Sequence, residues 1–253
     1  MRLTPLSRNL ARSSAQLGLG LVELMVGITV GLIVAAGAAM VATRQIDEHR
    51  RLMLEVQLQQ DLRIAADLLQ QDLRRAGYRG LPANGVWAPA RNVGSSSEVP
   101  AKDALSNPYV ALTQTTKNGP DIFYEYAKYH TDPSTGINAL NTSNTLQDYE
   151  QFGVQFSQDA LSLQLGLVNG QPNWQQITDP NSVVITAFTA EIVEQTVDLD
   201  DLCDCTAGVC PKQTIRRVDF TIKARAKGDS SIQRTVKVSE KIRSDGISGV
   251  CPS

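Results

Sequence analysis

The acidic side chains near the carboxyl end of the chain are the first group whose type and spacing could do chemistry. Four aspartates lie within seven residues, and the group consists of Asp198, Asp200, Asp201 and Asp204. Carboxylates gathered on one loop can supply the oxygen ligands that Ca²⁺ prefers. The spacing matches no EF-hand, and an acidic loop in contact with solvent explains it equally. These residues are therefore a candidate calcium site with a simpler alternative.

Cysteines lie among and after these aspartates. All four fall in the last fifth of the chain, at Cys203, Cys205, Cys210 and Cys251. An even number confined to one region predicts two local disulfides, formed outside the cytoplasm. A direct Cys203–Cys205 bond would be strained, so we expect Cys210 to bond one of this pair and Cys251 the other. Zinc is the alternative, but C-x-C-x4-C without a nearby histidine does not match structural zinc spacing.

No constellation typical of an enzyme is present in the sequence. The two histidines, His49 and His130, have no obvious cysteine or serine partner, and we interpret both as solvated side chains. There is no glycine-rich phosphate loop, no H-E-x-x-H and no G-x-S-x-G motif. The net charge of −2 provides no one-signed basic face for nucleic acid. We therefore predict no catalysis, no cofactor and no nucleic-acid partner.

Tyrosines recur in the segment that contains Tyr124, Tyr126 and Tyr129. They resemble a binding stripe. Aromatic residues are also enriched in strands, where they pack in the core or at an edge. We interpret these tyrosines as sheet packing.

Glu23 is a carboxylate at the start of an apolar segment. No charged residue occurs from Leu24 to Ala42, and 19 helical residues span about 28 Å, roughly one hydrocarbon thickness. A charge inside such a segment costs a few kcal/mol if it lies deep. Either Glu23 lies at the interface and contacts water, or it has a partner charge. Cleavage after Gly18 would create an ammonium at Leu19, which could neutralise Glu23 of a neighbouring subunit.

Residues 1–18 have the composition of a targeting leader. They include Arg2, Arg8 and Arg12 and no acidic residue. Such a basic segment stays on the cytoplasmic side of a membrane, so we expect the bulk of the chain to be translocated. An ordinary secretory signal has a shorter apolar core followed by a small-residue cleavage site. No such site stands out before Thr43.

An amphipathic pattern follows the apolar segment. Apolar residues recur every three or four positions, at Leu54, Leu58, Leu62, Ala65, Leu69, Leu73 and Ala76. This period is typical of a helix with one buried face. We predict one helix from Leu19 to about Ala76, with Arg74 and Arg75 at its negative end and Gly77 as its stop. A bundle helix or coiled coil would show the same stripe.

The remainder of the chain has strand patterns. We predict a loop over Leu81–Pro108 and another over residues 131–148, with a turn at Gly170–Asn173. Strands are expected at Tyr109–Thr116, Asp121–Tyr129, Leu161–Val168 and Ser182–Val197. Alternating apolar residues predict a hairpin of residues 218–224 and 232–242 around the turn at Lys227–Ser230. An antiparallel sheet with one solvated face, packed on the outer half of the helix, makes this an α+β protein.

The stretch GLGLVELMV, residues 18–26, resembles the class III signal of type IV prepilins and pseudopilins. The resemblance implies that a prepilin peptidase cuts after Gly18 and methylates Leu19, and that Glu23 is the assembly carboxylate. It also implies a long helix under an antiparallel β-sheet head, with the inner membrane and other minor and major pilins as partners. Leu19 and Gly20 depart from the phenylalanine and threonine usual at these positions.

The stretch QDLRRAGYRG, residues 71–80, narrows the resemblance to PilW-type minor pilins, which are related to the J pseudopilin of type II secretion. Leu81 replaces a cysteine that is common there. The resemblance implies a minor pilin that acts in pilus assembly, first in the inner membrane with a periplasmic head and then in the pilus. Alternatives are a J-type pseudopilin and a signal-anchored periplasmic enzyme or binding protein. The expected segments are leader 1–18, transmembrane half 19–42, amphipathic half 43–77 and head 78–253.

Overall fold

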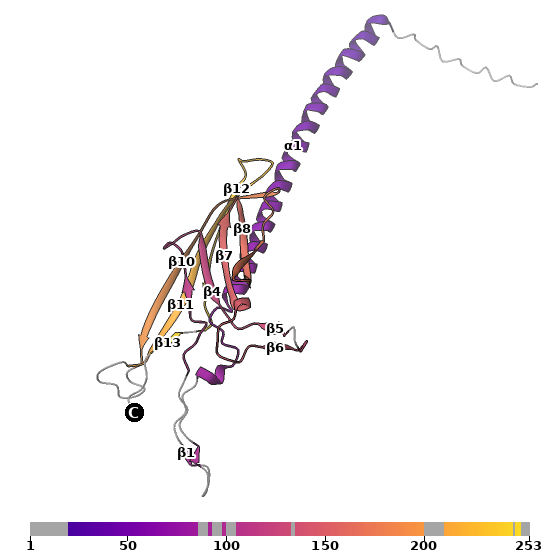
Figure 1. The fold of residues 1–253 in the computed structure, drawn as a ribbon. Coiled ribbons are helices and arrows are strands. Elements are labelled where there is room, and N and C mark those ends of the chain that lie inside the picture. Colours follow the sequence, from indigo (N-terminus) through magenta and orange to yellow (C-terminus); the bar gives the residue numbers. More distant parts are fainter. Residues whose placement is uncertain are drawn as a thin grey trace, which may run out of the picture. The chain divides into compact units, whose positions relative to one another are not determined.

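The computed structural model describes residues 20–85, 91–92, 98–99, 105–132, 135–199, 210–244 and 246–248. It has one long N-terminal α-helix and antiparallel β-sheets, which is the predicted α+β class (Figure 1). The chain divides into two compact units, Met1–Arg50 and Arg51–Ser253.

Helix α1 is 53 residues long and spans Leu21–Leu73. After Leu73 the chain tightens into a turn, which ends at Gly77 with a left-handed φ of +79°. Glycine adopts this conformation without steric cost, and the predicted stop at Gly77 agrees with it. The expected place of Arg74 and Arg75 in the last helical turn is wrong. Both follow the helix, because its regular hydrogen bonding ends three residues before the predicted boundary.

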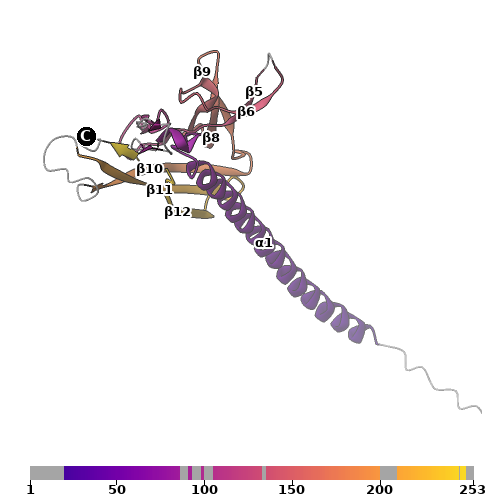
Figure 2. The same ribbon diagram turned by 90° about the horizontal axis from the view of Figure 1, so that it is seen from below.

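Two larger sheets and two small ones form the β-structure of the described residues. The five-stranded sheet has the order β3 (Leu112–Thr113), β4 (Asp121–Glu125), β7 (Gln151–Ser157), β8 (Ala160–Val168) and β9 (Gln171–Gln176). The four-stranded sheet has the order β10 (Val183–Asp198), β11 (Lys212–Ala226) and β12 (Gln233–Lys241), and β13 (Gly246–Ser248) also pairs with β11. Figure 2 shows β10, β11 and β12 as one layer.

The small sheets are two-stranded. They consist of β1 (Arg91–Asn92) with β2 (Glu98–Val99), and of β5 (Tyr129–Thr131) with β6 (Asn138–Leu140). Two short 3-10 helices, η1 (Pro82–Gly85) and η2 (Asp148–Glu150), complete the described elements. Every strand pair is antiparallel.

The strand predictions were correct where alternation was clear. Strands β8, β10, β11 and β12 lie where they were expected, and β11 pairs with β12 as the predicted hairpin. Of the expected strand Tyr109–Thr116, however, only Leu112–Thr113 is a strand. Tyr109 instead lies in a turn with its side chain fully buried.

Four further differences concern one strand, two loops and the number of sheets. Strand β7 was not predicted, and the middle of the expected loop 131–148 contains β6. The expected turn Gly170–Asn173 is wrong, because Asn169 and Gly170 make it alone, with positive φ values of 53° and 74°. Two residues with positive φ form the tight hairpin turn that suits the twist of its strands, and β9 begins at Gln171. The head also contains two larger sheets where one was expected.

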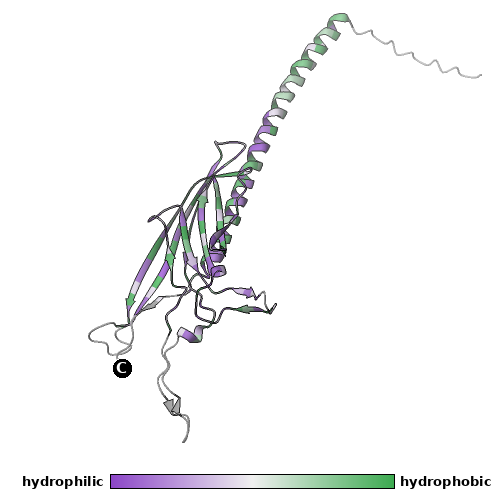
Figure 3. Ribbon diagram, viewed as in Figure 1, coloured by the Kyte–Doolittle hydropathy of each residue, from purple (hydrophilic) through white to green (hydrophobic). Residues whose placement is uncertain are grey.

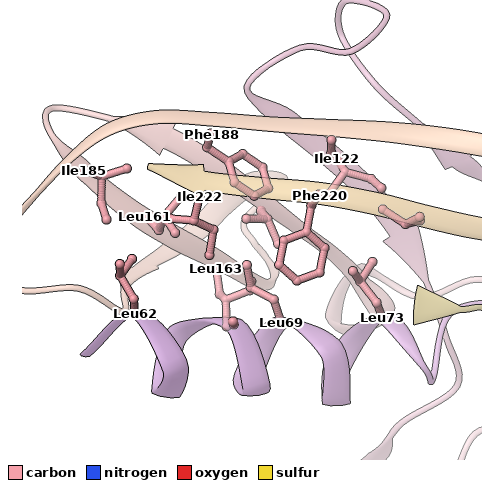
Figure 4. Close-up of a cluster of buried hydrophobic side chains, with 14 of the residues drawn as sticks. Leu62, Leu69, Leu73, Ile122, Leu161, Leu163, Ile185, Phe188, Phe220 and Ile222 are labelled. Carbon is pink, nitrogen blue, oxygen red and sulfur yellow. The ribbon is translucent and has the colours of Figure 1, made fainter. Parts of the chain in front are cut away.

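The hydrophobic core lies between the last part of α1 and both larger sheets. Helix α1 contributes Leu62, Leu69 and Leu73, which point at residues of β4, β8, β10 and β11 (Figure 4). Strand β11 alternates in burial from Arg216 to Ala226, and its inward apolar side chains are Val218, Phe220, Ile222, Ala224 and Ala226. Hydrophobic and hydrophilic residues alternate along the strands accordingly (Figure 3). Both sheets therefore share one apolar partner, the buried stripe of α1.

Two adjacent leucines of α1 test this packing. Leu69 is 0% exposed within the core cluster, whereas Leu68 is 40% exposed. We expect Leu69→Ala to lower the free energy of unfolding by about 2–5 kcal/mol, because it removes buried apolar area and leaves a cavity. The matched variant Leu68→Ala should cost under about 1 kcal/mol. Urea unfolding of the full chain in detergent micelles, followed by circular dichroism, measures both. Equal losses would contradict this core.

Candidate functional site

Glu23 lies in the first turn of α1. Its backbone N–H donates to the carbonyl of Gly20 at 2.9 Å, and Leu24 N–H donates to the same oxygen at 3.1 Å. The first turn of a helix presents unpaired N–H groups and the positive end of the helix dipole. The Glu23 carboxylate is therefore placed where a negative charge is favoured, and its residue is exposed.

The part of α1 that follows Glu23 is apolar and exposed. No charged residue occurs between Glu23 and Arg44, and every residue from Leu21 to Val41 is exposed. The two threonine hydroxyls donate back into the helix, from Thr29 to the Val26 carbonyl and from Thr43 to the Met40 carbonyl, each at 2.9 Å. Polar groups satisfied within one helix are what an apolar phase requires.

Within the described part of the chain, α1 is the one helix long and apolar enough to cross a membrane. Length and composition alone support this statement. An apolar segment of this kind near the amino terminus suggests membrane anchoring.

Asp72, at the end of α1, binds two tyrosines of the head. Its carboxylate accepts hydrogen bonds from the Tyr124 hydroxyl and, at 2.7 Å, from the Tyr126 hydroxyl. Both rings are buried, and Tyr126 stacks on Phe152 with 3.9 Å between ring centroids. Burial raises the pKa of both tyrosines, and the negative charge of Asp72 raises it further. Both phenols therefore remain neutral hydrogen-bond donors at pH values well above their ordinary pKa.

Arg74 makes the second polar contact between the helix end and the head. Its Nε donates to Glu240 Oε1 at 2.7 Å and its Nη2 to Oε2 at 3.2 Å, while Gln70 Nε2 donates to the same carboxylate at 3.1 Å. The hydrogen bonds that Arg74 donates to Glu240, followed by the negative charge of Glu240, raise the pKa of Arg74. Glu55, earlier on the helix, forms an ion pair with Arg234 of the neighbouring strand β12.

The backbone at Gly77 fixes the end of the helix to three loops and strands. Its N–H donates to the Glu125 carbonyl at 2.8 Å. Its carbonyl accepts from Asn107 Nδ2 at 2.8 Å and from Ser244 Oγ at 2.7 Å. A Cβ at Gly77 would lie 2.8 Å from the Ser244 Cβ, which is closer than real side chains approach. Gly77 is therefore required both for its conformation and for this close approach.

Glu150 is a fully buried carboxylate that sequence reasoning missed. It accepts hydrogen bonds from the Tyr109 hydroxyl at 2.9 Å, Asn141 Nδ2 at 2.8 Å and the Gln147 N–H at 3.0 Å. Burial, followed by the hydrogen bond and charge of Glu150, raises the pKa of Tyr109. Glu150 lies three residues after Gln147 and accepts its N–H as the glutamate of a capping box does. Glutamine is not among the usual N-cap residues, so this spacing gives no clear signal in the sequence. This network holds loops together.

The predicted amino-terminal and acidic sites are only partly within the described residues. Outside them lie Gly18, Leu19, Asp200, Asp201, Asp204, Cys203, Cys205 and Cys251. Asp198, the last residue of β10, forms an ion pair with Lys212 at 2.9 Å. Among the described residues, no group of three or more metal-binding side chains occurs. Cys210 is disulfide-bonded, and which cysteine it bonds stays a prediction.

The remaining residues considered from the sequence are two histidines and three tyrosines. His49 is exposed on α1, and His130 is exposed with its ring stacked on Tyr149, 4.1 Å between centroids. The interpretation of the tyrosines as sheet packing, in the core or at an edge, agrees with the buried positions of Tyr124 and Tyr126. Tyr129 lies exposed on β5, a strand of a two-stranded sheet and therefore an edge.

A long helix with a bare apolar half, whose other half packs on antiparallel sheets, is consistent with a pilin-like protein. Residues 51–242 match the family model described as prepilin peptidase-dependent protein B. This match covers more than half of the chain, and the chain belongs to that family. No curated protein and no solved structure gave a match. The family suggests a structural, non-enzymatic protein that depends on prepilin peptidase.

Alkaline titration tests the junction at Asp72. The raised pKa of Tyr124 and Tyr126 means that their stabilising effect is present below the unfolded-state pKa of about 10 and is lost as the pH rises above it. We expect Asp72→Asn to lower the pKa of both phenols, since it removes the charge, although burial still holds it above 10. Tyrosinate absorbance of the full chain in micelles measures this.

The control for this experiment is Asp67→Asn, at an exposed position of the same helix. It should leave the titration unchanged. Ionisation of all six tyrosines of the folded protein together near their ordinary pKa of about 10 would contradict the arrangement around Asp72.

Proposed function

We propose that this chain is a minor pilin of a type IV pilus, which acts in the complex that initiates the filament or forms its tip. In this proposal it is cut between Gly18 and Leu19 and N-methylated at Leu19. The observation that supports it best is the exposed apolar half of α1, with Glu23 in its first turn, in a member of the prepilin peptidase-dependent family. The GLGLVELMV and QDLRRAGYRG stretches add their resemblance to PilW-type minor pilins.

The proposed role of Glu23 follows from the cost of a charge in an apolar phase. A carboxylate within a membrane segment costs a few kcal/mol when it is unpaired and deep. Cleavage after Gly18 would leave an ammonium at Leu19, four residues before Glu23. Pairing of this ammonium with Glu23 of a neighbouring subunit would offset that cost only in the assembled state. Assembly would thereby be favoured over the isolated membrane-bound subunit.

Small residues on α1 support close packing with neighbouring helices. Gly27 and Gly31 are separated by four residues, and nothing lies within 4 Å of a Cβ built on either. Glycines at this spacing let two helices approach closely where lipid offers no hydrophobic driving force. In this proposal the apolar half of α1 contacts lipid before assembly and other minor and major pilins afterwards. The head stays in the periplasm and then on the pilus.

The proposed disulfides would form after the head reaches the periplasm. We propose that Cys210 bonds either Cys203 or Cys205 and that Cys251 bonds the other.

A J-type pseudopilin of a type II secretion system is the second candidate. It has the same expected architecture, and the QDLRRAGYRG resemblance extends to that related family. Gene deletion separates the two proposals. Loss of piliation and twitching supports the pilus, whereas loss of protein export with normal piliation supports the secretion system.

Processing can be tested by mass spectrometry of the amino-terminal peptide from cells with and without prepilin peptidase. We expect a peptide that begins at methylated Leu19 when the peptidase is present and at Met1 when it is absent. The replacement Gly18→Val should give the uncut form in both strains. A chain that begins near Ala42, or an uncut chain in cells that have the peptidase, would contradict the proposed maturation.

The assembly carboxylate can be tested separately. We expect Glu23→Ala to block incorporation into sheared filaments while cleavage continues, since the peptidase acts before the charge pairing. Incorporation should fall at least about tenfold, as for loss of a few kcal/mol. The control Glu48→Ala removes an exposed carboxylate of the same helix beyond the apolar segment and should assemble normally. Normal incorporation of Glu23→Ala would rule out the charge pairing.

A further inference from the structure

Strand β10 forms one edge of the four-stranded sheet, and the described residues cover only the first part of its outer side. Strand β11 pairs with it along its whole length, from Val183 to Asp198. On the other side, Ile185 N–H donates to the Asp159 carbonyl at 2.8 Å and Ala190 N–H to the Gly119 carbonyl at 3.2 Å. Gln114 Nε2 donates to the Ala190 carbonyl at 2.7 Å. After Ala190 the described residues make no further hydrogen bond on this side.

The direction of the remaining backbone groups follows from Ala190. In an antiparallel strand the N–H and C=O of one residue point to the same side, and this side alternates along the strand. The register after Ala187 is regular, so Ile192, Glu194 and Thr196 point outward, as Ala190 does. Leu199 N–H donates toward β11, to Pro211 at 2.9 Å, as the alternation requires. The outward backbone groups of these three residues have no hydrogen-bond partner within the described part of the chain.

This part of β10 is also solvated on both faces. Every residue from Glu194 to Asp198 is exposed, including Val197. A row of unpaired N–H and C=O groups on a long, exposed strand is a template for the addition of another strand. Added strands obtain affinity from main-chain hydrogen bonds and specificity from alternating side chains.

The charges along the outer edge of β10 indicate what kind of strand can be added there. Glu191, Glu194 and Asp198 are acidic, and no basic residue occurs from Glu191 to Leu199. Asp198 already pairs with Lys212, whereas Glu191 and Glu194 have no ion pair within the described part of the chain. A second copy of β10 would add its own three carboxylates to this edge, and like charges on paired strands are destabilising. We propose that the outer edge of β10, from Ile192 to Thr196, binds an extended, basic segment of a different polypeptide as an added strand.

Thr196→Pro tests this edge with little effect on the fold. Proline removes the outward N–H and places its ring on the edge, and it is tolerated at edge positions whose N–H is not bonded within the sheet. The matched control, Thr196→Val, keeps the N–H and a β-branched side chain. The probe is a fluorescent nine-residue peptide of alternating lysine and valine with blocked ends. A second peptide has glutamate in place of lysine.

Fluorescence anisotropy with the full chain in nonionic detergent micelles gives the readout. We expect the lysine peptide to bind the native chain and Thr196→Val alike, and to bind Thr196→Pro about tenfold more weakly, as for loss of one or two hydrogen bonds. Binding should weaken with salt, and the glutamate peptide should not bind. Absence of lysine-peptide binding to the native chain, or equal binding to Thr196→Pro, would overturn the proposal. Self-association of the native chain that Thr196→Pro abolishes would also overturn it, since the occupant would then be a second copy.

Amide hydrogen exchange of the unmodified chain provides a readout that does not depend on a variant folding. Before peptide is added, the amides of Ile192, Glu194 and Thr196 should exchange faster than those of Val193 and Gln195. The lysine peptide should slow the three outward amides and leave the inward ones unchanged. Uniform protection before peptide is added, or no protection after it, would contradict the open edge.

Discussion

The buried leucine stripe of α1 is the contact on which the rest of the head depends. Leu58, Leu62, Leu69 and Leu73 are almost completely buried against residues from both larger sheets. Burying one leucine contributes about 1.5–3 kcal/mol, and these four lie on one face of a single helix. The two sheets share few direct contacts, and each presents its apolar face to the same helix. Removal of the stripe would therefore expose both sheets at once.

Polar contacts at the end of α1 fix its position more than they add to stability. Arg74 has 44% of its side chain exposed, and ion pairs in contact with solvent typically contribute little to stability. Its two-point contact with Glu240 nevertheless restricts how the helix can rotate, and Asp72 with its two tyrosines adds a second restriction. Gly77 then turns the chain away within the space that Ser244 leaves. Burial of the leucines provides most of the stabilising free energy, and the hydrogen bonds determine how α1 is positioned on the sheets.

Sequence periodicity predicted the elements that have one buried face. Helix α1 and strands β8, β10, β11 and β12 alternate or repeat clearly, because one side of each meets the core. Strand β7 was missed because Gly153 interrupts its apolar pattern. The fold uses this glycine to admit the Phe123 ring, whose Cδ1 would lie 2.8 Å from a Cβ there. Glu150 was missed for a different reason: Tyr109 and Asn141 are not its neighbours in sequence, and only the folded chain brings them to its carboxylate.

The candidate site could be predicted where its residues are neighbours in sequence. Glu23 and the apolar segment after it are neighbours in sequence, and a helix preserves that proximity. The open edge of β10 is different, because it depends on which neighbours the topology places beside each half of the strand. Gln114, Gly119 and Asp159 cover the first half from distant parts of the chain. The change from apolar to acidic residues after Ala190 marks the second half of β10 as more polar, but it does not show which backbone groups a neighbour covers. Apolar helices offer similar surfaces to any neighbour in lipid, so a subunit that must select its partners needs a second, directional contact. Backbone groups at a sheet edge, flanked by charges of one sign, provide such a contact, since they fix both the path and the polarity of what they bind.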